Sequence, residues 1–364
     1  MNRIKIALWK PTHQLIRNSE KLDSKLYCIS KIFTDEIQQN EDNSKWKVFT
    51  EKDLDTFDVM LIEFENHQIT RKKLSEKYAI GNRVFTFEEY WVLDCEDTIT
   101  RRYHEYWNQL HHAQIHPFEA KTVLIFGGSS GIGKETALAF LKAGANVIIA
   151  GRNEERLKLA ESELEKEENN LAGIQWDITE IGNYESKLAE AESLFHREID
   201  VVINSAGIWT NSTFYEVTEK EYDEIMGTNL KGIYFICQLF ANYFIGHQIK
   251  GHIVNVLSNT GALPTVKPYG ISKWGGYGLT KGLGMHLAEY GIIVNGVAPG
   301  GIATELANWH KGDCPARRNS RIGRIGFPCE VAQIILQLAG FMGDNMPGEI
   351  VVCDGGDKAI GISL

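Results

Sequence analysis

Short apolar runs alternate with segments of helical length along the chain from residue 121 onward. The runs that predict β-strands are residues 121–126, 146–150, 172–176, 200–204, 252–257, 291–297 and 349–353. Helical patterns fill the gaps, including 132–143, 183–197, 219–247 and 329–341. Strands that are apolar along their whole length are typical of a parallel sheet covered by helices on both faces. We therefore expect an α/β fold with a doubly wound parallel sheet, whose ligand crevice lies at the carboxyl ends of the strands.

The first 118 residues carry a different pattern. Strands are predicted at 4–9, 26–32, 57–64 and 83–87, and helices at 68–79 and 88–115, with Pro117 ending the last helix. The first of these strands is followed by Lys10-Pro11-Thr12-His13 rather than by a glycine-rich loop, so we expect no dinucleotide to bind there. The change of pattern predicts two domains, a small α/β accessory domain over residues 1–118 and a larger domain over residues 119–364.

The overall composition argues against several classes of function. A net charge of −10 over 364 residues argues against a nucleic-acid-binding protein, which needs a basic surface. No apolar run approaches the roughly 20 residues of a membrane-spanning helix. The apolar run near the N-terminus is too short for a secretory signal, so we expect a cytoplasmic protein without membrane contact. The six cysteines are scattered, and no acidic or thiol set frames the histidines at 104, 111, 112 and 116, so we expect no disulfide framework and no metal.

A glycine-rich loop joins the first strand of the larger domain to its first helix. Gly127, Gly131 and Gly133 lie in "FGGSSGIG", directly after the apolar run and directly before the helical pattern. Glycine at such positions allows a tight turn and lets the backbone approach a pyrophosphate closely. The helix N-terminus that follows offers unpaired N–H groups and a partial positive charge to phosphate oxygens. The loop therefore predicts a dinucleotide site.

The end of the second strand bears on which dinucleotide binds. NAD sites usually carry an acidic residue there for the ribose 2′-hydroxyl, but this strand ends in Gly151-Arg152. A guanidinium can pair bidentately with a 2′-phosphate, so we expect NADP(H), with NAD(H) as the alternative. Arg152 could instead be a solvated surface residue paired with Glu154 or Glu155.

The spacing G-x-x-x-G-x-G and the segments after it resemble the short-chain dehydrogenase/reductase family. "FGGSSGIG" at 126–133 resembles its cofactor loop, with Phe126 replacing the usual threonine, and "NSAG" at 204–207 resembles its N-N-A-G segment, with Ser205 as a departure. The other matches, in chain order, are "WDIT" at 176–179, "TNLKG" at 228–232, "VLSNTG" at 256–261, "YGISK" at 269–273, "APGGIAT" at 298–304, "RIGFPCEVA" at 324–332 and "VVCDGG" at 351–356. The resemblance implies a Rossmann-type sheet and an NAD(P)-dependent enzyme that interconverts a carbonyl and a secondary alcohol.

Carried over residue by residue, the resemblance also implies the site. The catalytic residues that it implies are Asn229, Ser258, Tyr269 and Lys273. The cofactor-binding residues that it implies are Gly127, Ser129, Ser130, Gly131, Ile132, Gly133, Arg152, Asp177, Ile178, Asn204, Ala206, Gly207, Tyr269, Lys273, Pro299, Gly300, Ile302 and Thr304. In the family, the position of Asp177 contacts adenine, that of Lys273 grips the nicotinamide ribose, and that of Asn229 supports a water that relays protons.

The chemistry of these side chains agrees with such a role. Tyr269 and Lys273 lie one helical turn apart on one face of a predicted helix. A phenol with its ordinary pKa near 10 is a poor base at neutral pH, and a nearby ammonium lowers that pKa. Ser258 can hydrogen-bond the substrate oxygen and hold it toward the tyrosine. We expect hydride transfer between the nicotinamide and a carbonyl carbon, with Tyr269 as the proton donor or acceptor.

The helix after Tyr269 is rich in glycine, which lowers helix stability by about 1 kcal/mol per residue relative to alanine. These glycines are Gly270, Gly275, Gly276, Gly278, Gly282 and Gly284. In the family, the corresponding helix packs against its copy in another subunit, which implies a homodimer or homotetramer. Close packing within one subunit is the alternative explanation.

The substrate is the least determined part of the prediction. Residues 302–325 correspond to the variable substrate lid of the family, and Trp309 could line the pocket or cover the lid. Positive charge is concentrated in this segment by residues that include His310, Lys311, Arg317, Arg318 and Arg321. They indicate either an anionic substrate, such as a phosphorylated or nucleotide-linked sugar or an acyl thioester, or an ordinary solvated loop. Only eleven positions separate Ser258 from Tyr269, fewer than is usual in the family, so we expect a short, stiff loop there.

Two other functions remain open from the sequence. The chain could be a cofactor-binding regulatory or scaffold protein whose N-terminal domain contacts a partner. It could also be bifunctional, with the N-terminal domain handling a ligand of its own. Turnover of carbonyl compounds would separate an enzyme from a scaffold, and ligand binding by residues 1–118 would test the bifunctional alternative.

Overall fold

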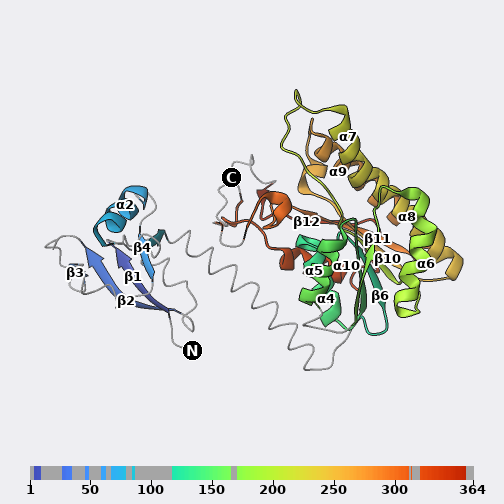
Figure 1. Cartoon of the computed structure of the whole chain (residues 1–364), viewed down its shortest axis with the longest axis horizontal. Coiled ribbons are helices and arrows are strands. Elements are labelled where there is room, and N and C mark those ends of the chain that lie inside the picture. The colour runs from blue at the N-terminus through green and yellow to red at the C-terminus, as the bar shows by residue number, and fades with distance from the viewer. Residues whose placement is uncertain are drawn as a thin grey trace. The chain divides into compact units, whose positions relative to one another are not determined.

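The computed structural model describes residues 4–9, 27–34, 46–48, 59–62, 67–78, 84–86, 117–164, 170–310, 313 and 320–357. The chain divides into two compact units, one built mainly from Met1–Thr98 and a larger one from Ile99–Asp313 and Arg317–Leu364 (Figure 1). The predicted helix at 88–115 and its histidines lie outside the described residues, as do Lys311, Arg317 and Arg318 of the predicted lid.

The N-terminal unit contains a parallel sheet of five strands in the order β3-β2-β1-β4-β5. The strands are β1 (Ile4–Trp9), β2 (Tyr27–Thr34), β3 (Trp46–Val48), β4 (Val59–Ile62) and β5 (Val84–Thr86), and one helix, α2 (His67–Tyr78), lies between the last two. Ala7, Leu8 and Met60 are fully buried in this unit. Four of the strands and the helix were predicted. The sequence pattern does not reveal β3, because three residues are too few to show a period.

The larger unit contains seven parallel strands in the order β12-β11-β10-β9-β6-β7-β8. These strands are β6 (Thr122–Phe126), β7 (Asn146–Gly151), β8 (Leu171–Gln175), β9 (Val201–Asn204), β10 (His252–Val256), β11 (Ile293–Pro299) and β12 (Ile350–Cys353). The order reverses between β6 and β9, which are paired from Val123 with Val201 to Phe126 with Asn204. This confirms the predicted doubly wound, Rossmann-type sheet and places its crevice at the ends of these two strands.

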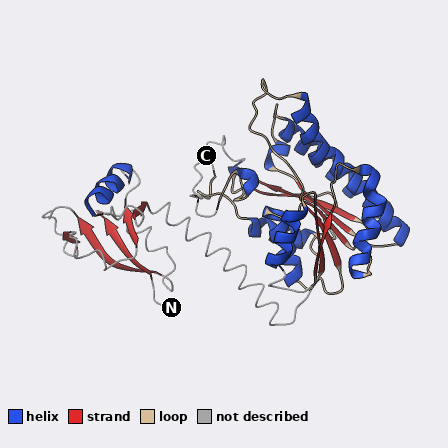
Figure 2. Ribbon diagram, viewed as in Figure 1, coloured by secondary structure: helices blue, strands red, loops and turns tan. Residues whose placement is uncertain are grey.

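Helices cover both faces of this sheet (Figure 2). One face packs against α4 (Gly131–Lys142), α5 (Glu154–Leu164) and α10 (Pro328–Leu338), and the other against α6 (Tyr184–Phe195), α8 (Ile233–His247) and α9 (Pro268–Leu287). Successive side chains of β6 point to opposite faces. Val123 and Ile125 therefore join the first core, and Leu124 and Phe126 join the second.

The predicted helix at 219–247 is not continuous. It consists of α7 (Glu219–Met226), a π-helical turn at Gly227–Gly232 and α8. Gly232 lies so close to Ile178 that an added Cβ would come within 2.7 Å of the carbonyl oxygen of Ile178. The wide turn also contains Asn229, one of the predicted catalytic residues. Such π-helical turns occur frequently at functional sites, and the amphipathic pattern does not reveal them.

Candidate active site

The glycine loop after β6 has a geometry that only glycine can adopt. Gly127 has φ +76°, and an added Cβ would lie 2.7 Å from the backbone nitrogen of Ala206. A Cβ on Gly133 would come within 2.1 Å of the carbonyl oxygen of Gly127. These contacts pack the loop against the start of α4 and against the "NSAG" segment. The residues present therefore fit the pyrophosphate of a dinucleotide, because the backbone approach is not blocked by side chains.

The segment after β11 reaches this loop from the other side of the crevice. A Cβ on Gly131, at the first position of α4, would lie 3.1 Å from the Cγ2 atom of Thr304. Thr304 follows Pro299 and Gly300 at the end of β11, while the side chain of Ile302 is buried in the core beneath. The structure thus brings together two segments that the sequence places about 170 positions apart.

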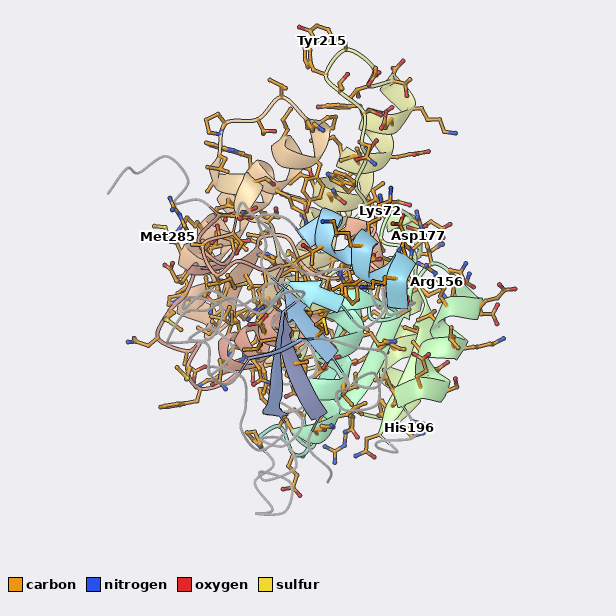
Figure 3. All side chains as sticks on the ribbon, turned by 90° about the vertical axis from the view of Figure 1, so that its left-hand side faces the viewer. Lys72, Arg156, Asp177, His196, Tyr215 and Met285 are labelled. Carbon is orange, nitrogen blue, oxygen red and sulfur yellow. The ribbon has the colours of Figure 1, made fainter. Side chains whose placement is uncertain are left out.

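A cavity of about 290 Å³ lies at the ends of β7 and β8. Its lining includes Arg152, Gln175 and Asp177. Asp177 lies at the surface of the larger unit, and its Oδ1 atom accepts hydrogen bonds of 2.8 Å from both the N–H and the hydroxyl of Thr179 (Figure 3). The side chain of Ile178 is buried in the core next to it. The position of the cavity matches the adenosine end of the predicted cofactor site.

Arg152 is exposed at this cavity. Glu154, which was a possible partner, instead forms an ion pair of 2.6 Å with Lys158. A Cβ on Gly151 would lie 3.6 Å from the hydroxyl oxygen of Ser129, so the glycine loop and Arg152 flank the same end of β7. Among the described residues at the end of β7, no acidic side chain takes the place that an NAD site would give to one, because the strand ends at Gly151 and Arg152 follows.

The side chain of Asn204 is directed into the sheet. Its Nδ2 atom donates to Oδ1 of Asn255 at 2.8 Å and lies 3.5 Å from the sulfur of Cys237. Asn255 in turn donates to the hydroxyl of Thr280 at 2.9 Å, which links β9 and β10 to α9. The amide of Asn204 therefore supports the sheet beneath the crevice, and a cofactor contact by this residue stays a prediction.

Asn229 holds the backbone of Ile208 from both directions. Its Oδ1 atom accepts the N–H of Ile208 at 2.8 Å, and its Nδ2 atom donates to the carbonyl oxygen of Ile208, also at 2.8 Å. The same Nδ2 atom lies 3.4 Å from the hydroxyl of Ser272. Asn229 is almost fully buried, so these bonds satisfy an amide that would otherwise be costly to bury.

Tyr269, Ser258 and Lys273 come together at the start of α9. Nζ of Lys273 lies 5.6 Å from the centre of the Tyr269 ring, and Ser258 is close enough to the phenol to lower its pKa. Lys273 is buried and donates to the carbonyl oxygen of Val256 at 3.0 Å. A Cβ on Gly207 would lie 3.8 Å from this Nζ atom and 3.5 Å from Oδ1 of Asn229, so Gly207 completes the group.

The electrostatics of this group differ from the sequence expectation. Burial raises the pKa of Tyr269, and only the hydrogen bond from Ser258 acts in the opposite direction. Burial also lowers the pKa of Lys273 to about 8. We expected the ammonium to lower the pKa of the phenol. In the protein without a cofactor, desolvation of both groups is the larger effect.

Ser272 is a site residue that the sequence reasoning missed. It is fully buried, and its hydroxyl donates to the carbonyl oxygen of Tyr269 at 2.7 Å while facing Asn229. It therefore joins the π-helical turn to the first turn of α9. Its position directly before Lys273 in the sequence could have indicated this role. A serine buried in a helix at that position needs a hydrogen-bond partner within the site.

The described part of the predicted lid makes local polar contacts, among them the ion pair of 3.6 Å between His310 and Asp313. His310 and Arg321 are exposed, and Trp309 packs with Ile325 against a small cluster that includes Phe327. Nearby, Arg156 forms an ion pair with Glu305. Among the residues that the structure describes, no group of three or more His, Cys, Asp or Glu residues could hold a metal. Across the same ranges, no helix combines the length and apolar character needed to cross a membrane.

Comparisons with known proteins agree on one family. A family model described as "short chain dehydrogenase" matches residues 121–313. A 3-oxoacyl-[acyl-carrier-protein] reductase from Thermotoga maritima is 35% identical over 242 residues, which make up 65% of this chain and 98% of that protein. A gluconate 5-dehydrogenase from Gluconobacter oxydans is 29% identical over 255 residues, 67% of this chain and 97% of that protein.

A solved structure gives the same result. The crystal structure of a short-chain type dehydrogenase/reductase from Mycobacterium marinum is 30% identical, with a TM-score of 0.61, over 67% of this chain and 98% of that one. The relatives, the family match and the seven-stranded parallel sheet show that this chain belongs to the short-chain dehydrogenase/reductase family, whose members are oxidoreductases that act on CH–OH and C=O groups.

Proposed function

We propose that the larger unit is an NADP(H)-dependent oxidoreductase that interconverts a carbonyl compound and a secondary alcohol, with Tyr269 as the general acid and base. The observation that carries the proposal is the grouping of Ser258, Tyr269 and the buried Lys273 at the start of α9, with Nζ of Lys273 5.6 Å from the centre of the tyrosine ring. Ser258 follows the end of β10, and α9, which carries Tyr269 and Lys273, comes next along the chain. β10 is the neighbour of β9, which forms the crevice with β6. The glycine loop opens on the same edge of the sheet, because it follows the carboxyl end of β6.

Each side chain has a definite task in this reaction. A nicotinamide held at this site would supply the hydride for reduction or accept it in oxidation. Ser258 holds the substrate oxygen, and Tyr269 gives its proton to that oxygen during reduction or takes it back during oxidation. The raised pKa keeps the phenol protonated at neutral pH, which is the form that reduction needs. Lys273 contributes a cationic hydrogen-bond donor beside Gly207.

The choice of NADP(H) rests on Arg152. Its guanidinium is exposed at the cavity at the end of β7, and Glu154 is already paired with Lys158. A 2′-phosphate would meet this guanidinium and the hydroxyl of Ser129, whereas a 2′-hydroxyl would find no carboxylate at the end of β7. These contacts support NADP(H) over NAD(H).

The relatives suggest two substrate chemistries to examine first. One is named as a 3-oxoacyl-[acyl-carrier-protein] reductase and another as a gluconate 5-dehydrogenase. The first name describes a ketone two carbons from an acyl carbonyl, and the second describes a hydroxyl on the carbon chain of a carboxylate. His310, which is paired with Asp313, and Arg321 are exposed in the predicted lid, and this basic character is compatible with an anionic substrate.

We also propose a homo-oligomer formed through the outer face of α9. On this face the added Cβ of Gly278 or Gly282 would meet nothing within 4 Å, and Ile271, Trp274 and Met285 are exposed. Figure 3 shows Met285 projecting at the surface, where it is 81% exposed. Close packing within one subunit, the alternative explanation, accounts for Gly284. Its added Cβ would come within 2.1 Å of the backbone nitrogen of Gly348.

A turnover assay with both cofactors tests the proposal. Acetoacetyl-coenzyme A would be the 3-oxoacyl probe with NADPH or NADH, and gluconate would be the probe for oxidation with NADP+ or NAD+. We expect absorbance changes at the nicotinamide band that favour NADPH in the unmodified protein. Cofactor binding without turnover over a wider panel of acyl, steroid, sugar and polyol carbonyl compounds would instead favour the regulatory or scaffold alternative.

A further inference from the structure

The segment "VVCDGG" at 351–356 resembles the family's closing segment and contains none of the predicted site residues. After β12 the chain forms a turn at Asp354–Gly356, in which Gly355 has φ +62° and Gly356 has φ +82°. Both values lie in the left-handed region that favours glycine. The N–H of Gly356 donates to Oδ1 of Asp354 at 3.0 Å. The two glycines therefore fix the direction of the Asp354 carboxylate.

The other oxygen of this carboxylate reaches the catalytic serine turn. Oδ2 of Asp354 accepts a hydrogen bond of 3.3 Å from Nδ2 of Asn259, a buried residue that directly follows Ser258. Asn259 begins the 3-10 turn Asn259–Ala262, which is closed by the hydrogen bond of 2.9 Å from the N–H of Gly261 to the carbonyl oxygen of Ser258. A carboxylate 95 positions away in the sequence thus holds the turn that carries Ser258.

The same turn contacts two more parts of the site. A Cβ on Gly300, in the segment expected to border the nicotinamide, would lie 2.7 Å from the Cβ atom of Asp354. The carbonyl oxygen of Gly355 accepts the N–H groups of Arg321 at 2.9 Å and Ile322 at 3.2 Å, at the end of the predicted lid. The turn after β12 is therefore a common support for the serine turn, the nicotinamide segment and the lid.

Asp354 also lies close to the helix that carries Tyr269 and Lys273. The ring of Tyr277, two turns after Tyr269 on α9, lies against Gly261, whose added Cβ would be 2.6 Å from that ring. Burial first, and then the charges of Asp354 and Cys353, raise the pKa of Tyr277 to about 12. The carboxylate is thus within electrostatic reach of α9 as well as of the serine turn.

We infer that Asp354 is a positioning residue that sets the hydroxyl of Ser258 against Tyr269 through its hydrogen bond to Asn259. The inference rests on the proposed function, in which Ser258 and Tyr269 share the substrate oxygen. A hydrogen bond to a carboxylate is stronger and more directional than one between neutral groups. Small displacements of groups that orient a substrate lower the rate far more than they lower the stability of the fold.

Two single variants and their combination test this role. Asp354→Asn keeps the shape but turns an N–H donor toward either Asn259 or Gly356, so one bond is lost. Asn259→Asp brings two carboxylates together. We expect each to lower kcat by about tenfold or more, the low end of the effect of misplaced groups, with the KM for NADPH changed less than about twofold. In the combined variant, residue 354 becomes the donor and residue 259 the acceptor, which restores the hydrogen bond between them. We expect this variant to recover most of the lost kcat.

The matched control is Glu349→Gln, which converts an exposed carboxylate to an amide just before β12 without touching the turn. It should keep the kcat of the unmodified protein. If the unmodified protein turns over and Asp354→Asn keeps its kcat, or the combined variant is no better than the single variants, the positioning role is wrong while the proposed function stands. If the unmodified protein shows no turnover with any probe, the proposed function fails, and the role of Asp354 fails with it.

Discussion

The ammonium group of Lys273 lies inside the protein, 3.0 Å from the carbonyl oxygen of Val256. The residue is only 4% exposed, and burial lowers the pKa of its amine from the ordinary value of 10.5 to about 8. Between these two pH values the unfolded chain binds more protons than the folded protein, so this group makes the free energy of unfolding rise with pH. Below pH 8 both states carry the charge, and its burial lowers stability in full.

Lys273→Met is therefore expected to abolish turnover and yet stabilise the fold at pH 7. Removal of the buried charge should stabilise the fold by more than the loss of the hydrogen bond to Val256 destabilises it. We therefore expect a net gain of about 1–2 kcal/mol in the free energy of unfolding. The gain should disappear as the pH rises from 8 toward 10.5. Urea unfolding without cofactor at pH 7 and pH 9.5 measures both effects. If the variant is less stable than the unmodified protein at pH 7, burial of the Lys273 charge does not destabilise the fold, and this account is wrong.

Gly133→Ala tests the cofactor loop. The new methyl group would come within 2.1 Å of the backbone oxygen of Gly127, and neither element can move without opening the loop. We expect a loss of NADPH binding and a destabilisation of about 1–3 kcal/mol, the usual range for overpacking. Gly182→Ala is the control, because its added Cβ meets nothing within 4 Å. Fluorescence titration with NADPH and thermal unfolding measure the two effects. If Gly133→Ala binds NADPH as tightly and is as stable as Gly182→Ala, the steric requirement for glycine in the loop is contradicted.

Arg152→Ala tests the cofactor preference. Loss of a charge-assisted contact with a 2′-phosphate should weaken NADPH binding by about ten- to a hundredfold, and NADH binding should stay nearly constant. Arg156→Ala is the matched control, since that arginine is exposed nearby but is paired with Glu305. Isothermal titration of the unmodified protein and of both variants with each cofactor gives the dissociation constants. Tighter binding of NADH than of NADPH by the unmodified protein would show that NAD(H) is the cofactor.

Gly278→Arg tests the oligomer. The position is open within the subunit, so a large side chain should leave the fold intact and block a partner on the outer face of α9. We expect sedimentation equilibrium to give the mass of a single chain for this variant and a multiple of it for the unmodified protein. Gly182→Arg, at another open position, should keep the mass of the unmodified protein. An oligomer unchanged by Gly278→Arg would place the interface elsewhere.

The sheet of the larger unit could be predicted because its strands are apolar along their whole length. The predicted strand at 349–353 is observed at Ile350–Cys353 and that at 291–297 at Ile293–Pro299, so the predicted boundaries are wrong by only one or two residues. The glycine loop was also predictable, since a steric requirement at Gly127 or Gly133 is local to the chain. The division between residues 118 and 119 stays a prediction, because the residues just before Pro117 lie outside those that the structure describes.

The finer features of the site could not be predicted, because they depend on contacts between distant parts of the chain. The bonds from Asn229 to Ile208 span 21 positions, and that from Asp354 to Asn259 spans 95. No local period encodes either pair. The shift in the pKa of Tyr269 depends on how deeply α9 packs against the turn of Ser258, which sequence spacing alone does not determine.

The most direct test of the central claim is the turnover of Tyr269→Phe with NADPH and the best substrate of the unmodified protein. Phenylalanine keeps the ring and removes only the hydroxyl whose pKa Ser258 lowers. We predict that NADPH binding stays within about twofold and that kcat falls by at least about a hundredfold, the contribution expected of a general acid. A Tyr269→Phe variant that binds NADPH and keeps the kcat of the unmodified protein would contradict the account.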